Sequence, residues 1–215
     1  MEKLKNNQKL IIFDCDGVLV ESEPIAISIL IKLLQEQNFN VDNNYGKQFF
    51  GLSAKDCVEM TEKKFSKKVS VDFFEKFASE THKAFKNKLK PIKGIELALA
   101  NIPNPKCVAS GSTKERVKLS LDLVGISKYL ENIFSATDVK QGKPFPDIFL
   151  FAAEKMGYLP NECIVIEDSD AGMKAGLAAN MKVYLYKPSN DFDFNIPNDV
   201  VVFSDMEELP LILQN

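Results

Sequence analysis

Two aspartates stand two residues apart, directly after an apolar run near the N-terminus. The run LIIF at residues 10–13 is followed by Asp14, Cys15 and Asp16. Carboxylates crowded at the mouth of a buried strand repel one another and lose hydration, so a nearby positive charge has to offset the cost. A metal ion or a phosphate-binding cation supplies such a charge, and phosphoryl transfer uses both.

Three further polar groups follow or lie between apolar runs later in the chain. Each alone has an ordinary structural explanation, as a turn, a helix N-cap or a solvated lysine. Their occurrence together, with the first acid pair, favours chemistry over local capping. The groups are Ser110 with Gly111 and Ser112, Lys143 in the segment GKPFPD, and Glu167 with Asp168.

Phosphoryl transfer requires the residue types that these groups supply. A carboxylate can attack phosphorus, Mg²⁺ can neutralise that carboxylate and the phosphate oxygens, and hydroxyl and ammonium donors can hold the remaining oxygens. Backbone N–H groups at a helix N-terminus after Ser110 would add to anion stabilisation. The residues therefore predict a magnesium-dependent phosphoryl-transfer site.

An α/β fold is needed to bring these groups together. Short β-branched runs alternate with amphipathic helical patterns in the second half of the chain, which is typical of a parallel sheet with crossover helices. Polar residues after such strands meet at the carboxyl edge of the sheet. We expect strands at residues 10–13, 106–109, 133–136, 164–167, 182–186 and 200–203.

The region between the first two expected strands is of a different kind. Residues 20–89 contain no strand pattern and instead repeat apolar residues at helical spacing. Helices are expected at 23–37, 54–65 and 71–89, with Ser53 and Ser70 as N-caps of the last two. The sequence therefore predicts a helical insertion directly after the first strand.

Composition limits the partners of the protein. The chain has 215 residues, 45% of them hydrophobic, a net charge of −3 and a single arginine, Arg116. It can bury a sizeable core, and it lacks the basic field that attracts nucleic acid or acidic membranes. The four cysteines have no metal-binding spacing, and Cys15 is expected to pack as a small hydrophobe. With no signal segment or membrane-spanning run expected, we predict a cytoplasmic protein, monomeric or weakly dimeric, that acts on a small phosphorylated molecule.

Four motifs together resemble the haloacid dehalogenase superfamily, specifically its beta-phosphoglucomutase-like phosphatases with a helical cap. The resemblance covers nearly the whole chain and implies a Rossmann-like parallel sheet core over residues 1–19 and 89–215, with the helical cap over residues 20–88. The motifs are DCDGV at 14–18, VASGS at 108–112, GKPFPDIF at 142–149 and EDSDAG at 167–172.

The resemblance also implies roles for the motif residues. Asp14 would be the nucleophile that forms an aspartyl-phosphate, and Asp16 the general acid and base. The two carboxylates would point together because metal and phosphate lie between them. Mg²⁺ would be bound by the Asp14 side chain, the Asp16 backbone carbonyl and Asp168, with Glu167 assisting. The phosphoryl oxygens would be held by Ser110, Gly111 and Lys143.

Substrate contacts outside these motifs are expected at two places. Lys114 and Arg116 follow the SGS segment and could meet a second anionic group of the substrate. In similar proteins the cap loop that here contains Ser53 and Lys55 faces the site. These four residues are therefore the candidate substrate contacts.

Two departures from beta-phosphoglucomutases favour a phosphatase. Where similar mutases carry a histidine on the first cap helix and an arginine in the cap loop, this chain has Ala26 and Ala54 by ungapped counting. The predicted activity is hydrolysis of a sugar phosphate or a related polyol or sugar-acid phosphate. A beta-phosphoglucomutase-like isomerase is the alternative, and a receiver-like phosphoaspartate signalling domain, with Thr137 and Asp138 at the third strand end, is a further one.

Overall fold

The computed structural model describes residues 8–188 and 194–214 and divides the chain into two compact units. One unit contains Met1–Val20 and Pro91–Asn215, and the other is Glu21–Lys90. Residues 1–7, 189–193 and 215, which belong to the predicted core range, lie outside the described residues.

The first unit is built on a six-stranded parallel sheet with the strand order β3-β2-β1-β4-β5-β6. The predicted α/β fold class is confirmed, and each expected strand is present to within one residue at either end. The strands are Leu10–Phe13 (β1), Lys106–Ser110 (β2), Ile133–Ser135 (β3), Cys163–Glu167 (β4), Lys182–Tyr186 (β5) and Val201–Phe203 (β6).

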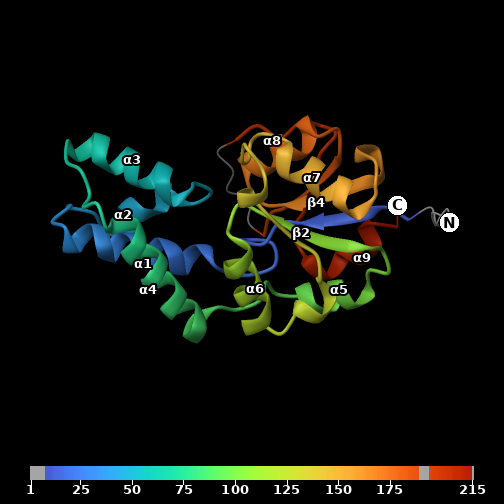
Figure 1. Cartoon of the computed structure of the whole chain (residues 1–215), viewed down its shortest axis with the longest axis horizontal. Helices are drawn as coiled ribbons and strands as arrows, with labels where there is room; N and C mark the ends of the chain where they lie inside the picture. The colour runs from blue at the N-terminus through green and yellow to red at the C-terminus, as the bar shows by residue number, and fades with distance from the viewer. Residues whose placement is uncertain (1–7, 189–193, 215) are drawn as a thin grey trace. The chain divides into compact units, whose positions relative to one another are not determined.

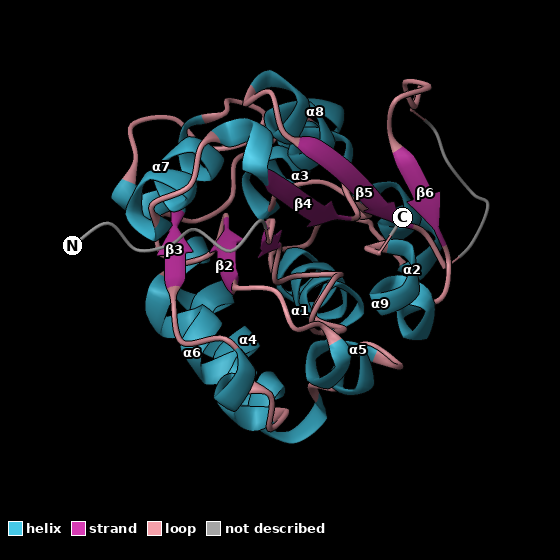
Figure 2. Cartoon of the chain, turned by 90° about the vertical axis from the view of Figure 1, so that its right-hand side faces the viewer, coloured by secondary structure: helices cyan, strands magenta, loops and turns pink. Residues whose placement is uncertain are grey.

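Helices cover both faces of this sheet, as Figure 2 shows. Strands β1 and β4 are buried along their whole length, which explains their continuous apolar sequence. Alternate strand residues pack with α7 and α8 in one apolar cluster, while α5 and α6 lie over the opposite face. The helices are Ile95–Asn101 (α5), Lys114–Leu123 (α6), Asp147–Met156 (α7), Asp170–Ala178 (α8) and Leu209–Ile212 (α9).

Hydroxyl N-caps start the two helices that follow the site strands. The Thr113 side chain accepts a hydrogen bond from the backbone N–H of Arg116 at the start of α6, so the serines of the SGS segment remain available for other contacts. Ser169 starts α8 by accepting from the Gly172 N–H. Short 3₁₀ turns complete the unit at Ser127–Tyr129 (η2), Ala136–Asp138 (η3), Pro160–Glu162 (η4) and Met206–Glu208 (η5).

The second unit consists of helices (Figure 1). Their apolar side chains form a cluster of their own. Ala26 and Ala54, the residues at the two mutase-specific positions, pack against that cluster. Within the described residues of both units, no helix has the length and apolar character needed to cross a membrane. The elements of the second unit are Glu23–Glu36 (α1), Asn43–Gly46 (α2), Lys47–Phe49 (η1), Ala54–Phe65 (α3) and Phe73–Lys88 (α4).

One of the two predicted N-caps in the helical unit is correct. Ser53 accepts a hydrogen bond from the Asp56 N–H and starts α3. The prediction for Ser70 is wrong, because α4 begins at Phe73 with Asp72 as its N-cap. Ser70 instead binds the side chain of Gln37, donating its N–H to Oε1 at 2.8 Å and accepting from Nε2 at 2.6 Å. Its polar atoms tie the start of this segment to the end of α1.

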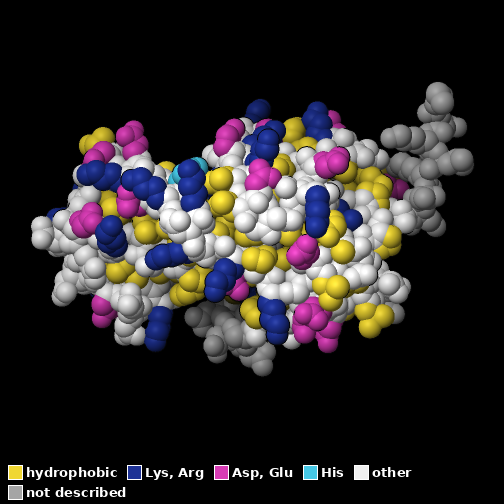
Figure 3. Space-filling view, turned by 90° about the horizontal axis from the view of Figure 1, so that it is seen from below, with side chains coloured by type: hydrophobic (Ala, Val, Ile, Leu, Met, Phe, Trp, Pro, Cys, Tyr) yellow, Lys and Arg dark blue, Asp and Glu magenta, His cyan; other side chains and the backbone are white. Residues whose placement is uncertain are grey.

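Charge is mixed on the molecular surface. On the face seen in Figure 3, Lys and Arg side chains are interspersed with acidic and apolar ones and form no continuous basic patch. This distribution agrees with the net charge of −3. That face therefore presents no single-sign field of the kind that attracts nucleic acid.

Candidate active site

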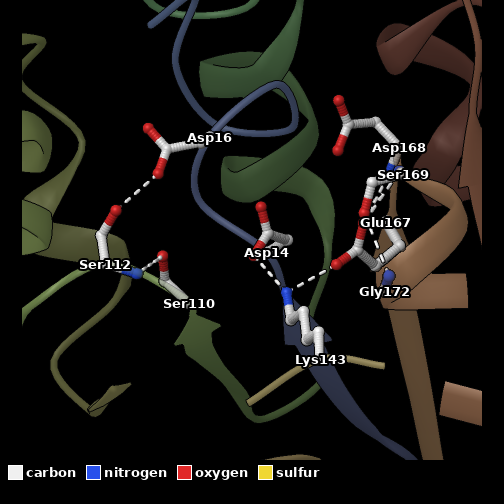
Figure 4. A network of polar contacts seen from close by, with 9 residues as sticks. All are labelled: Asp14, Asp16, Ser110, Ser112, Lys143, Glu167, Asp168, Ser169 and Gly172. Carbon is white, nitrogen blue, oxygen red and sulfur yellow. Dashed lines mark hydrogen bonds and ion pairs between the residues drawn. The ribbon is translucent and has the colours of Figure 1, made fainter. Parts of the chain in front are cut away.

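The predicted acids and Ser110 lie at the C-terminal ends of three adjacent strands (Figure 4). β1 leads into Asp14 and Asp16, β2 ends at Ser110, and β4 ends at Glu167. This edge is where open parallel sheets bind ligands, because the loops diverge there and leave backbone groups exposed. Lys143 reaches the same place from the loop before α7.

A buried ion network joins Lys143 to two carboxylates. The Lys143 Nζ atom donates to Asp14 Oδ1 and, at 2.5 Å, to Glu167 Oε1. The exposed fractions of these side chains are 11% for Lys143, 9% for Asp14 and 1% for Glu167. One ammonium thus faces two carboxylates, and Asp168 adds a third nearby. The network has an excess of negative charge when all of these groups are ionised.

The pKa shifts of the three groups show which carboxylate is the least stabilised in its ionised form. Burial, opposed by Lys143 and reinforced by Glu167 and Asp16, raises the pKa of Asp14 to about 7. Burial also acts to raise the pKa of Glu167, but Lys143 and backbone N–H groups hold it below its usual value. For Lys143 burial acts to lower the pKa, yet the two carboxylates raise it above the ordinary lysine value. A further positive charge would therefore chiefly stabilise the ionised form of Asp14.

Glu167 is held by the start of α8. Its Oε2 atom accepts hydrogen bonds from the Asp168 N–H at 2.8 Å, the Ser169 N–H at 3.0 Å and the Ser169 hydroxyl at 3.0 Å. A Cβ atom at Gly172 would lie 1.7 Å from Glu167 Oε1, so only glycine leaves room for this carboxylate. Gly17 has the same relation to Asp168, because a Cβ there would lie 1.9 Å from Oδ2, at a φ of +81°.

The acidic residues fit a hard divalent cation. Asp14, Glu167 and Asp168 each offer a carboxylate oxygen, and these oxygens lie within 4.8 Å of one another. An all-oxygen donor set suits Mg²⁺ or Ca²⁺ better than the metals that prefer imidazole or thiolate. The unfavourable charge at Asp14 is a second observation in favour of a cation at this cluster.

Asp16 lies in a separate set of contacts. Its Oδ2 atom accepts from the Ser112 hydroxyl at 2.8 Å and its Oδ1 atom from Arg116 Nη2 at 3.0 Å. In Figure 4 the Asp16 side chain is directed toward Ser112, whereas Asp14 is directed toward Lys143. The expectation that the two carboxylates point together is therefore not met, because each has its own cationic partner.

The loop after β2 offers donors to an anion. Ser110 is 1% exposed, and its Oγ atom accepts from the Ser112 N–H at 3.1 Å, which leaves its own O–H available as a donor. Gly111 is exposed, and a Cβ at that position would meet nothing within 4 Å. The backbone is thus open at the place where a phosphoryl group was predicted to bind.

The four candidate substrate contacts all have protein partners. Lys114 Nζ lies 2.8 Å from Asp138 Oδ1, and Arg116 binds Asp16. In the helical unit, Ser53 Oγ donates to Asp56 Oδ2 at 2.6 Å, and Lys55 forms a loose, exposed pair with Glu59. Their contact with substrate stays a prediction.

Sequence reasoning missed part of the support around the acids. The residue types did not single out Ser169, whose hydroxyl binds Glu167. Ser112 belongs to the SGS motif, but the motif did not predict that its hydroxyl binds Asp16. The glycines of DCDGV and EDSDAG were the available signal, since a glycine beside an acid marks close packing against it.

A comparison with family models identifies the family of the chain. The model of the haloacid dehalogenase-like hydrolase family matches residues 11–186. This chain therefore belongs to the haloacid dehalogenase-like hydrolases, and the resemblance predicted from the four motifs is confirmed.

Individual relatives match over most of their own length. The 6-phosphogluconate phosphatase of Escherichia coli strain K12 is 26% identical over 203 residues, which cover 93% of this chain and 92% of the relative. A phosphorylated carbohydrates phosphatase of Thermotoga maritima is 27% identical over 176 residues, with 80% and 82% covered. The family match and these relatives make the chain a phosphoric monoester hydrolase.

A solved structure shares the fold. The beta-phosphoglucomutase of Clostridium difficile superposes with a TM-score of 0.76 at 24% identity, covering 94% of this chain and 93% of that one. At 24% identity this structural similarity supports a shared fold and gives no evidence about the reaction.

Proposed function

We propose that the protein is a Mg²⁺-dependent phosphatase of a small phosphorylated carbohydrate, acting through an aspartyl-phosphate on Asp14. The observation that carries the proposal is the buried network in which Lys143 contacts both Asp14 and Glu167, with Asp168 beside them. It supplies a carboxylate nucleophile, a phosphate-binding ammonium and an acidic cation site in one place.

Asp14 is the attacking group in this proposal. Its Oδ1 atom is engaged by Lys143, which leaves Oδ2 to attack phosphorus. Asp14 and Asp168 would hold Mg²⁺ together with the Asp16 backbone carbonyl, while Glu167, whose oxygens already accept four hydrogen bonds, would assist by fixing Lys143 and the start of α8. A bound Mg²⁺ supplies charge neutralisation at the nucleophile and at the phosphoryl oxygens.

Three groups would bind the transferring phosphoryl group. Ser110 donates its hydroxyl, Gly111 offers a backbone N–H at an open position, and Lys143 donates from Nζ. These donors are fixed before the reaction, so they need little reorganisation as charge develops. Asp16 would protonate the leaving oxygen and later take a proton from the attacking water.

The relatives support the proposed substrate class. The named activities of the two phosphatases described above are directed at 6-phosphogluconate and at phosphorylated carbohydrates. We therefore propose a sugar phosphate, or a related polyol or sugar-acid phosphate, with residues 20–88 acting as the helical cap that supplies specificity. Ser53 and Lys55 remain the proposed contacts from that cap.

Reaction with water is favoured over transfer between sugar hydroxyls. The positions where similar mutases carry histidine and arginine are Ala26 and Ala54, which pack against the apolar cluster of the helical unit. A receiver-like domain is not supported, since the chain is a hydrolase of this family and Asp138 is bound to Lys114 and to the Ser135 N–H.

The cysteines support a reducing compartment. Cys15, Cys57, Cys107 and Cys163 are all buried and free, and burial raises the pKa of each thiol. Thiols of this kind behave as inert core residues. We propose the cytoplasm on this ground.

A panel of phosphorylated metabolites tests the proposal. Purified protein is incubated with hexose phosphates, polyol phosphates and 6-phosphogluconate, with Mg²⁺ or with excess EDTA, and both free phosphate and isomerised sugar are measured. We expect phosphate release that needs Mg²⁺ and no bisphosphate activator. Full activity in EDTA would overturn the metal requirement, and bisphosphate-dependent isomerisation without phosphate release would establish the mutase.

A further inference from the structure

The carboxylate of Asp16 is bound through both of its oxygens. Ser112 Oγ donates to Oδ2 at 2.8 Å, and Arg116 Nη2 donates to Oδ1 at 3.0 Å (Figure 4 shows the Ser112 arm). A carboxylate held at one oxygen can still rotate, whereas one held at both has its plane fixed as well. The Asp16 side chain is 32% exposed, so it lies partly in contact with solvent.

Both arms come from one short segment, and that segment is itself fixed. The Ser112 N–H donates to Ser110 Oγ at 3.1 Å, and the Ser112 carbonyl accepts from the Ser135 hydroxyl at 2.7 Å. Ser135 is fully buried on β3, the neighbouring strand. Arg116 lies in the first turn of α6, where its N–H is bound by the N-cap Thr113. The backbone that carries the two donors is therefore held by contacts other than Asp16.

The ion pairs on α6 favour a structural partner for Arg116 over a substrate anion. Lys114, on the same turn, pairs with Asp138, and Arg116, the sole arginine of the chain, pairs with Asp16. An anionic group of the substrate on Arg116 would share the guanidinium with the Asp16 carboxylate and would lie close to a like charge. The planar guanidinium of arginine matches the geometry of a carboxylate better than the ammonium of lysine does. This explains why arginine suits the position.

We propose that Arg116 and Ser112 are positioning residues that hold the Asp16 carboxylate in one orientation for proton transfer. The inference rests on the proposed acid–base role of Asp16 and assigns its orientation to these two side chains. A general acid contributes about 10²- to 10⁴-fold, and part of that is lost when its geometry is loosened. Neither positioning residue needs to touch the substrate.

Substrates with different leaving groups test the inference. The ratio kcat/KM reports the steps up to phosphoryl transfer to Asp14, in which an alkoxide leaving group needs a proton and a nitrophenolate does not. We expect Arg116→Ala to lower kcat/KM for a hexose phosphate by about 10- to 100-fold, and for nitrophenyl phosphate by less than about threefold. Ser112→Ala should give the same pattern with a smaller loss, and Arg116→Lys should recover part of it. Lys118→Ala, which removes an exposed lysine from the same helix, is the control.

A double-mutant cycle identifies the residue through which Arg116 acts. If Arg116 works only by orienting Asp16, then adding Arg116→Ala to Asp16→Ala changes kcat/KM for the hexose phosphate by less than about twofold. Additive losses would overturn the inference. So would equal losses on both leaving groups, a higher kcat/KM in Arg116→Ala, or a rise in KM confined to substrates with a second anion, such as a phosphorylated sugar acid.

The same data separate this inference from the proposed function. If Asp16→Ala shows no dependence on the leaving group, then Asp16 is not the acid; its acid–base role and the positioning role both fail, while phosphatase activity through Asp14 is tested separately by phosphate release. If Asp16→Ala shows that dependence and neither Arg116→Ala nor Ser112→Ala does, only the positioning role fails. Thermal unfolding of each variant identifies any that do not fold. If Arg116→Ala does not fold, the test uses Ser112→Ala, which removes only one hydroxyl group.

Discussion

The two aspartates that follow β1 lie in contrasting surroundings. Asp14 belongs to a buried network with Lys143 and Glu167, in which the side chains are at most 11% exposed. Asp16, two residues later, belongs to a half-exposed ion pair with Arg116, whose side chains are 32% and 36% exposed. One short segment thus carries one carboxylate in a low-dielectric network and another near solvent.

This difference explains how two identical side chains can do different work. A buried carboxylate with excess negative charge around it is poised for a cation and a phosphoryl group. A carboxylate near solvent can exchange protons with water and with a leaving group. The surroundings, and not the residue type, divide the proposed roles of nucleophile and acid–base.

The largest expected effect comes from removing the ammonium of the buried network. Lys143→Met keeps the length of the side chain but leaves Asp14 and Glu167 facing one another without a cation. We expect kcat to fall by at least about 10³-fold and the free energy of unfolding of the metal-free protein to fall by about 3–5 kcal/mol. Phosphate release and urea unfolding measure the two effects. Lys140→Met, at an exposed lysine in the same loop, is the control, and equal behaviour of the two variants would contradict the account.

A methyl group placed against Glu167 should have the next largest effect. In Gly172→Ala the new Cβ would lie 1.7 Å from Oε1 of the carboxylate, so Glu167 must move and Lys143 with it. We expect a loss of about 10²-fold in kcat, because misplacement by about 1 Å costs that much. Gly142→Ala, where a Cβ meets nothing within 4 Å, should stay within about threefold. Activity of Gly172→Ala near that of the parent would show that Glu167 needs no fixed position.

A third effect is on stability alone and concerns pH, and it sharpens the contrast between the two acids. In the metal-free protein, which EDTA maintains, folding raises the pKa of Asp14 from 3.8 to about 7. Between pH 3.8 and about pH 7 the folded protein therefore binds more protons than the unfolded chain. The stability contributed by this group is therefore lost as pH rises from about 4 to about 7. Asp14→Asn should remove that loss and be more stable than the parent at pH 8, with little difference near pH 4. Urea unfolding across this range measures it, and a parent that is the more stable protein at pH 8 would contradict the burial argument.

Much of the fold was predictable because its signals are local. Each parallel strand is an apolar run bounded by turn residues, so every expected strand is present, and the pattern on α3 predicted its ends at Ala54 and Phe65. Ser70 was misassigned because a hydroxyl can bind any nearby donor or acceptor. Its partner Gln37 is 33 residues away, where no local pattern reports it.

The residues of the site were predictable from their types and spacing, whereas the orientations of their side chains were less so. Strand order placed Asp14, Ser110 and Glu167 at one sheet edge, as the spacing of the motifs indicated. The orientation of Asp16 was not predictable, since it depends on Ser112 and on Arg116, which lies 100 residues further along the chain. The partner of a surface carboxylate is set by tertiary packing.

The most direct measurement concerns the covalent intermediate on Asp14. The protein is mixed with Mg²⁺ and a sugar phosphate that carries a radiolabelled phosphoryl group, quenched in acid within the first turnover, and digested. The account predicts label in the peptide that contains Asp14, lability of that label to hydroxylamine, and no label in Asp14→Asn, whose turnover should fall by at least about 10³-fold. Rapid phosphate release without labelled peptide, or Asp14→Asn activity within tenfold of the parent, would contradict it.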